Sequence, residues 1–273
     1  MKTISAKRIE DAVSKLCVEA NTVLRSDVLR QLQSVYKKEK KGRAKNILEA
    51  IIKNASLAKK EGLAICQDTG MPVVFLELGQ DARISGDLRL AVNKGVQSGY
   101  KKGNLRKSIV SDPLLRGESG YSPVVIHTDI VPGNKLKITV LPKGFGCENK
   151  SQSRMFNPTV KIDEIKKFII EAVKSAGPDA CPPYIVGVGI GGTADYAALL
   201  AKKALLKKIG GKAVKLEEDL LKKINKLNIG PMGLGGKATC LAVNIQFYPT
   251  HIAGMPVAVN ISCHALRSAT AIL

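Results

Sequence analysis

The chain of 273 residues contains no tryptophan, and aromatic residues make up only 4% of it. Stacking platforms for single-stranded nucleic acid are therefore scarce, and no zinc-finger or RNA-binding motif compensates for them. The longest apolar runs, at 71–76 and 184–190, are far too short to span a membrane. The first eight residues lack the apolar core of an export signal, so the sequence predicts a cytoplasmic protein without membrane association.

Cysteine and histidine are also sparse, with six and three residues respectively. Six cysteines in a chain of this length do not make a disulfide framework, and in the cytoplasm they are either small buried hydrophobes or metal ligands. Zinc is disfavoured because its ligands are usually closely spaced. The one adjacent pair, Cys263 and His264, would point to opposite faces of a strand.

The charge is strongly one-sided, with 43 Lys and Arg against 23 Asp and Glu, giving a net charge of +20. Neutralisation of phosphates is one explanation of such a charge, and a basic nucleic-acid-binding protein with structural cysteines is the alternative from another class. Much of the lysine, however, is spaced along predicted helices as a solvated face. A second explanation of the net charge is attraction of an anionic substrate or an acidic partner subunit, and no nucleic acid is expected to bind.

Hydrophobic periodicity predicts a mixed α/β fold, with a helical N-terminal region followed by mixed sheets and flanking helices. The whole of 1–273 is expected to form one catalytic domain, with a possible division into a helix-rich part, 1–115, and a sheet-rich part, 116–273. The β-rich run 124–127 and the alternating run 136–140 are separated by the turn residues Pro132, Gly133 and Asn134. This arrangement predicts that the two runs pair as a hairpin.

The segment 187–192, Gly-Val-Gly-Ile-Gly-Gly, matches the glycine pattern of a dinucleotide-binding loop and lies between a predicted strand and a predicted helix. That fingerprint also needs an acidic residue at the end of a second strand about 20 residues later, and none stands there. The segment is therefore interpreted as a tight strand–helix turn or as an anion site at a helix N-terminus.

Three cysteines stand in segments that could contribute ligands to a metal cluster. They are Cys66 before Gln67 and Asp68, Cys181 before two prolines, and Cys263. Three thiolates leave one iron of a four-iron cluster without a protein ligand, and an open iron can act as a Lewis acid. Two further residues could bind an anion. Arg106 can clamp a carboxylate through two hydrogen bonds, and His251 stands between two predicted strands. Glycine clusters at 143–149 and 230–237 are typical of backbone that approaches a ligand closely.

Taken together, these segments resemble the class I, iron–sulfur-dependent fumarate hydratase family, specifically its alpha subunit, a form shared with L-tartrate dehydratase alpha subunits. The matching segments run in order along nearly the whole chain: 66–70, 126–133, 143–149, 180–184, 189–193, 233–236, and 248–251 through Cys263 to Arg267. Two positions depart from the family pattern, because Phe145 stands where a glycine is common and Cys147 where serine is usual.

The resemblance implies that Cys66, Cys181 and Cys263 hold a [4Fe–4S] cluster. It further implies a set of substrate contacts, made by Gln67, Asp68, Arg106, His251 and the backbone at Gly146. The reaction would be reversible hydration of fumarate to L-malate, as in the tricarboxylic acid cycle, with L-tartrate dehydration as the alternative.

The resemblance also implies that no catalytic proton-transfer residue lies on this chain. That residue is expected on a separate beta subunit, so the enzyme would be active only as a heteromer, in an α2β2 assembly. The substrate would be a dicarboxylate.

Overall fold

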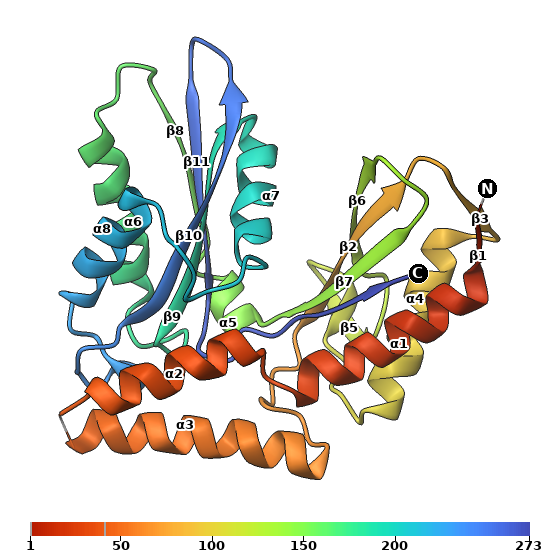
Figure 1. The fold of residues 1–273 in the computed structure, drawn as a ribbon, viewed down its shortest axis with the longest axis horizontal. Helices are drawn as coiled ribbons and strands as arrows, with labels where there is room; N and C mark the ends of the chain where they lie inside the picture. The colour runs from red at the N-terminus through yellow and green to blue at the C-terminus, as the bar shows by residue number, and fades with distance from the viewer. Residues whose placement is uncertain (1, 41) are drawn as a thin grey trace. The chain divides into compact units, whose positions relative to one another are not determined.

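The computed structural model describes residues 2–40 and 42–273, which form two compact units (Figure 1). The first unit comprises 1–25, 54–145 and 267–273, and the second comprises 26–53 and 146–266. Helices and strands are interspersed along the chain, which confirms the predicted mixed α/β class. The boundary considered at 115/116 falls inside the first unit, between two short paired strands, β4 (Ile109–Asp112) and β5 (Arg116–Gly120).

A four-stranded sheet of order β12-β7-β2-β6 forms the centre of the first unit. Its strands are β2 (Met71–Gly79), β6 (Val125–Val131), β7 (Leu136–Lys143) and β12 (Ala269–Ile272). The predicted hairpin between the runs at 124–127 and 136–140 is wrong, because β2 pairs in parallel with β6 and antiparallel with β7. The apolar run of β2 is buried from Pro72 to Leu76, and a strand buried on both faces takes the centre of a sheet.

Two helices, α1 (Ala6–Thr22) and α4 (Leu88–Lys102), pack against each other and bury the apolar face of this unit. Two N-caps fix where they begin: the Ser5 side chain accepts from the Arg8 amide, and Asp87 accepts from Leu90. A Cβ at Gly99 of α4 would lie 2.5 Å from the Ser14 carbonyl, so glycine permits this close helix contact. Two short strands, β1 (Lys2–Ser5) and β3 (Ala82–Ser85), pair in parallel beside these helices.

The second unit contains a four-stranded sheet of order β10-β9-β11-β8, which has helices on both faces (Figure 1). Its strands are β8 (Gln152–Phe156), β9 (Tyr184–Gly192), β10 (Cys240–Thr250) and β11 (Met255–Ser262). Its helical elements are α2 (Ser26–Lys38), α3 (Gly42–Glu61), α5 (Phe145–Glu148), α6 (Ile162–Ala176), α7 (Ala194–Ala204), α8 (Lys215–Asn225) and the 3₁₀ turn Pro231–Gly233. The part of α3 after Lys53 and the first residue of α5, Phe145, belong to the first unit.

The glycine-rich segment 187–192 serves helix packing in this sheet. A Cβ on Gly187 or Gly189 of β9 would collide with a backbone carbonyl of α7, at Ala201 and Ala197 respectively. The glycines at 187 and 189 therefore let α7 lie directly on β9. Gly191 and Gly192 have positive φ and form the tight strand–helix turn that was one of the two interpretations of this segment.

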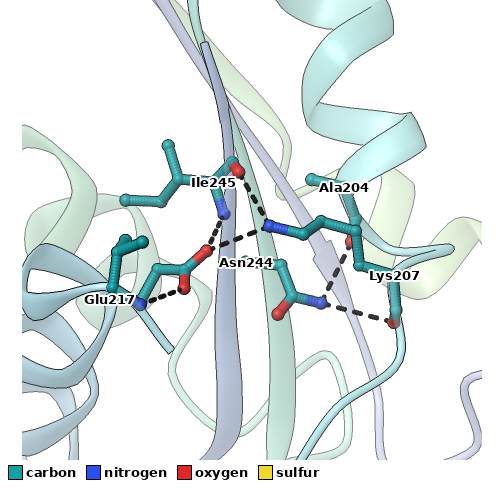
Figure 2. A network of polar contacts seen from close by, with 6 residues as sticks. Ala204, Lys207, Glu217, Asn244 and Ile245 are labelled. Carbon is teal, nitrogen blue, oxygen red and sulfur yellow. Dashed lines mark hydrogen bonds and ion pairs between the residues drawn. The ribbon is translucent and has the colours of Figure 1, made fainter. Parts of the chain in front are cut away.

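The β10 edge of this sheet is closed by side chains, as Figure 2 shows. β10 is the edge strand, and the outward N–H of Ile245 donates to Glu217 Oε1 at 2.7 Å. The outward carbonyl of Ile245 accepts from Lys207 Nζ at 3.1 Å, and Lys207 lies 3.3 Å from the same carboxylate oxygen. Asn244 donates to the Ala204 carbonyl at 3.1 Å and joins the same strand to the end of α7. The Glu217–Lys207 pair thus replaces a neighbouring strand at Ile245, which blunts an edge that could otherwise pair with another chain.

Candidate functional site

The Cys66–Gly70 loop of the first unit follows α3 and leads into β2, and it is fixed from two sides. The Ile65 amide donates to the Asn21 carbonyl at 2.9 Å, and the Ile65 carbonyl accepts from Asn54 Nδ2 at 2.9 Å. Cys66 is half-buried and Gln67 is exposed. The loop therefore presents the thiol and the amide side chain on a backbone whose start is held in place.

The Asp68 carboxylate joins this loop to the glycine segment that begins at Lys143. Its Oδ1 accepts from the Gly70 amide at 3.0 Å, and its Oδ2 accepts from the Phe145 amide at 2.9 Å. Each carboxylate oxygen can accept a second hydrogen bond, so Asp68 can hold the loops together and still contact a ligand. Two segments that are 77 residues apart in sequence are thereby brought together in one unit.

Arg106 and two buried side chains complete the surroundings of the loop. The Arg106 amide donates to Thr69 Oγ1 at 3.0 Å, while the Arg106 side chain is exposed. Tyr100 donates to the Thr69 carbonyl at 2.8 Å, and burial raises the pKa of this phenol well above its ordinary value. The guanidinium of Arg267, only 3% exposed, donates to the Asp68 carbonyl at 2.7 Å and to Asn21 Oδ1 at 3.2 Å.

The second unit brings Cys181 and Cys263 into neighbouring segments, although 82 residues separate them in sequence. The His264 ring donates from Nδ1 to the Cys181 carbonyl at 3.1 Å, and the His264 amide lies 3.4 Å from the same oxygen. Cys181 itself has a φ of +56°, an uncommon conformation for a residue with a side chain. The Met232 amide of the second glycine cluster donates to the Pro182 carbonyl at 2.8 Å, so this cluster borders the cysteine loop.

The segment that carries Gly146 is anchored beside Cys181 in the same unit. The Cys147 thiol donates to the Ala180 carbonyl at 3.3 Å. Glu148 accepts from Lys202 of α7 and, at 3.1 Å, from Asn260 of β11. These contacts fix α5 against β11, the strand that leads into Cys263.

Burial divides the six cysteines into two groups of three. Cys17, Cys147 and Cys240 are buried, whereas Cys66, Cys181 and Cys263 are partly exposed, and none of the six is in a disulfide. Burial raises the pKa of the Cys17 and Cys240 thiols to about 12, which suppresses the thiolate form that binds metals. The partly exposed group coincides with the three cysteines chosen from the sequence.

This donor set fits an iron–sulfur cluster by its chemistry. Cysteine sulfurs are the ligands that such clusters take, and the three partly exposed cysteines of this chain stand outside its helices and strands. Cys66 belongs to the first unit, and Cys181 and Cys263 belong to the second. Within the residues that the structure describes, no three His, Cys, Asp or Glu side chains are grouped as a metal site.

His251 lies apart from the two cysteines of its unit. It stands in the turn between β10 and β11, whereas Cys263 directly follows the other end of β11 (Figure 1). The His251 ring is exposed, and its Nδ1 accepts from the Ala253 amide at 3.2 Å. In the neutral ring the proton is therefore on Nε2, which can donate a hydrogen bond.

The sequence assigned no role to Tyr100, Asn21 or Glu148, which hold the loops from behind. No local motif marks Tyr100 or Asn21, and Glu148 had only its place in the 143–149 segment as a signal, because each acts through a partner far away in the chain. Arg267 had only its place in the family pattern as a signal, and its contact to Asp68 crosses 199 residues.

No helix among the described residues has the length and apolarity to cross a membrane.

The comparison with known proteins places the chain among the hydro-lyases. A family model described as fumarate hydratase (Fumerase) matches residues 10–272, and the chain belongs to this family.

Relatives with related names cover nearly the full length of the chain. One from Methanocaldococcus jannaschii, named putative L(+)-tartrate dehydratase subunit alpha, is 41% identical over 96% of this chain and 96% of its own length. One from Escherichia coli UTI89, named L(+)-tartrate dehydratase subunit alpha, is 31% identical over 98% of this chain and 92% of its own. The K12 protein of the same name is 30% identical over the same shares.

Proposed function

We propose that this chain is the alpha subunit of an iron–sulfur hydro-lyase that interconverts fumarate and L-malate. The observation that supports the proposal is the division of the cysteines, since the three partly exposed thiols are the three to which the resemblance assigns the cluster. We infer that Cys66, Cys181 and Cys263 hold a [4Fe–4S] cluster. When bound, the cluster supplies a Lewis acid that helps a 2-hydroxy acid lose its hydroxyl as water.

The side chains of this chain would bind and orient the dicarboxylate. Arg106 has an exposed guanidinium that can hold one carboxylate through paired hydrogen bonds. Gln67 and Asp68 lie directly after Cys66 and would contact the hydroxyl end of the substrate. The Gly146 backbone, held by the Cys147 and Glu148 anchors, would offer a further contact, and His251 would donate from Nε2 to a carboxylate oxygen.

A separate beta subunit is part of the proposal. The relatives from M. jannaschii and E. coli are named as alpha subunits, which supports an enzyme with a second kind of chain. We place the proton-transfer residue on that beta chain and expect an α2β2 assembly. The net charge of +20 suits an acidic partner surface or an anionic substrate.

L-tartrate is the second candidate substrate, because the relatives carry that name. Both reactions eliminate water from a four-carbon 2-hydroxy dicarboxylate, so one set of contacts on this chain serves either. The choice would depend on groups around the second hydroxyl of tartrate.

The test is hydration and dehydration kinetics after anaerobic reconstitution with iron and sulfide, for the chain alone and with its beta subunit. We expect turnover only with both chains and a higher kcat/KM for fumarate or malate than for L-tartrate. The opposite preference would make L-tartrate the substrate. Robust turnover by the isolated chain would refute the requirement for a beta subunit, and no turnover of either substrate by the complex would refute the function.

A further inference from the structure

Glu39 is the single acidic residue in the basic run 37–41, Lys-Lys-Glu-Lys-Lys, and it is buried. It is only 3% exposed, whereas Lys38 and Lys40 on either side of it are exposed to solvent. A carboxylate is costly to remove from water unless hydrogen bonds or paired charges replace its hydration. The contacts of Glu39 within the second unit therefore indicate what this run does besides linking α2 to α3.

The Glu39 carboxylate holds the backbone of the second glycine cluster, 230–237. Its Oε2 accepts from the Lys237 amide at 2.7 Å, across 198 residues of sequence, and its Oε1 accepts from the Lys40 amide at 3.0 Å. A Cβ on Gly236 would lie 2.9 Å from Glu39 Oε2, so a glycine at this position lets the carboxylate reach the backbone. Hydrogen bonds to an ionised carboxylate are roughly twice as strong as those between neutral groups. Glu39 therefore anchors one end of the cluster to the end of α2.

The second glycine cluster needs such an anchor because much of its backbone is left-handed. Five of the seven residues 230–236 have positive φ, namely Gly230, Met232, Gly233, Gly235 and Gly236. Met232, at a φ of +52°, adopts this conformation although it carries a side chain. Sparsely populated backbone of this kind persists only where the surrounding contacts fix it. The Asn228 side chain, which accepts from the Gly236 amide at 3.2 Å, and the Glu39 carboxylate supply such contacts.

The other side of the same cluster packs against the Cys181 loop. The Met232 amide donates to the Pro182 carbonyl at 2.8 Å, and a Cβ on Gly233 would collide with Pro178. The Cys181 amide in turn donates to the Pro178 carbonyl at 3.2 Å. The cluster thus contacts this loop on both sides of Cys181, and all of these residues belong to the second unit.

We propose that Glu39 is a positioning residue that fixes the Cys181 loop for cluster binding by way of the second glycine cluster. This inference rests on the proposed function, because it takes Cys181 as a ligand of the iron–sulfur cluster. The Glu39 carboxylate holds Lys237, and the glycine cluster then presents the Met232 amide to Pro182. Without the carboxylate, the glycine cluster loosens, and the Cys181 thiol samples positions that do not suit the bound iron.

Hydrogen exchange of the metal-free chain tests whether Glu39 fixes this loop. The matched control is Glu217→Ala, because Glu217 is 5% exposed, belongs to the same unit and also accepts from a backbone amide at 2.7 Å, at the edge of β10. The quantity compared is the exchange rate of the Met232 amide divided by that of Val188, a fully buried residue of β9.

We expect Glu39→Ala to raise this ratio about tenfold or more, since a hydrogen bond to a charged group is worth at least a factor of ten in an equilibrium constant. Glu217→Ala should leave the ratio within about twofold of the wild type, because it destabilises the unit without loosening the glycine cluster. A ratio that is unchanged in Glu39→Ala, or that rises equally in both variants, would overturn the inference.

Iron retention tests the consequence for the cluster. The complex with the beta subunit is reconstituted without oxygen and then exposed to air, and the iron that stays bound is measured over time. Iron should leave Glu39→Ala about tenfold faster than the wild type, because loss of a supporting contact behind a metal ligand typically weakens metal binding about 10–100-fold. Glu217→Ala should lose iron at the wild-type rate. Equal rates in all three proteins would overturn the inference.

Glu39→Gln keeps one side-chain oxygen that can accept from the Lys237 amide, so both of its measured values should lie between those of the wild type and Glu39→Ala. If the alanine variant does not fold, a glutamine variant identical to the wild type in both measurements overturns the inference. A wild-type complex that takes up no iron would refute the proposed function. The exchange ratio of the metal-free chain would then still decide whether Glu39 fixes the Cys181 loop.

Discussion

Replacing Glu217 with alanine would test whether side chains close the edge of the second sheet. Glu217 is 5% exposed, and its carboxylate accepts from the buried Ile245 amide at 2.7 Å and from Val214 at 2.9 Å. In the variant, the Val214 amide and the Lys207 ammonium can form hydrogen bonds with water instead, because both residues are at least partly exposed. The main cost is therefore one buried N–H without an acceptor, about 1–3 kcal/mol, with a smaller contribution from the lost ion pair.

The expected loss of about 2–3 kcal/mol corresponds to a fall in Tm of roughly 4–6 °C for a chain of this size. Glu217→Gln keeps one acceptor oxygen and should lose about half as much. The matched control is Glu218→Ala, an exposed neighbour on α8, which should change Tm by less than about 2 °C.

Thermal unfolding followed by circular dichroism measures the global effect, and amide hydrogen exchange measures it at Ile245 itself. The exchange rate of the Ile245 amide should rise more than that of its neighbours in β10. A Glu217→Ala variant with unchanged Tm and an equally protected Ile245 amide would refute the edge-closing role.

Three further predictions concern packing, pH and the loop at the site. Gly189→Ala should destabilise the chain by more than about 3 kcal/mol, because the new Cβ meets the Ala197 carbonyl, while Gly211→Ala has open space and should change stability by less than about 1 kcal/mol in urea titration. Burial raises the pKa of the Cys17 thiol to about 12, so this thiol ionises at lower pH in the unfolded chain than in the folded one. The free energy of unfolding should therefore be unaffected below about pH 9 and fall as pH rises toward 12, and it should fall less steeply in Cys17→Ala. Asp68→Ala should free the Phe145 amide from its carboxylate, raising KM and lowering kcat of the complex at least about tenfold, and a variant with unchanged kinetics would contradict this.

Much of the fold could be predicted because apolar residues recur at the spacing of a helix or form runs typical of a buried strand. The apolar runs at 71–76 and 184–190 lie in the buried strands β2 and β9, and the helix expected after 187–192 is α7. Strand order could not be predicted in the same way. The turn after β6 indicated a hairpin with β7, but burial of β2 on both faces places it between them, and this depends on the whole unit.

For the candidate site, the sequence identified loops but not their supports. The choice of Cys66, Cys181 and Cys263 agrees with their exposure, and the contact of Asp68 with the 143–149 segment joins two predicted motifs. The support by Arg267 crosses most of the chain, so no local pattern could reveal it. The glycines at 187 and 189 illustrate a pattern that has two explanations. Glycines at this spacing occur in phosphate-binding loops, but here they allow a helix to pack closely on a strand.

Iron and sulfide analysis tests most directly whether the three accessible cysteines hold an iron–sulfur cluster. The complex with the beta subunit, reconstituted without oxygen, should contain about four irons and four sulfides per alpha chain and absorb broadly near 400 nm. Serine at Cys66, Cys181 or Cys263 should remove most of this iron, whereas alanine at the buried Cys17 or Cys240 should leave it in place. A folded wild-type complex that takes up no iron, or iron that survives the loss of each accessible cysteine, would contradict the claim.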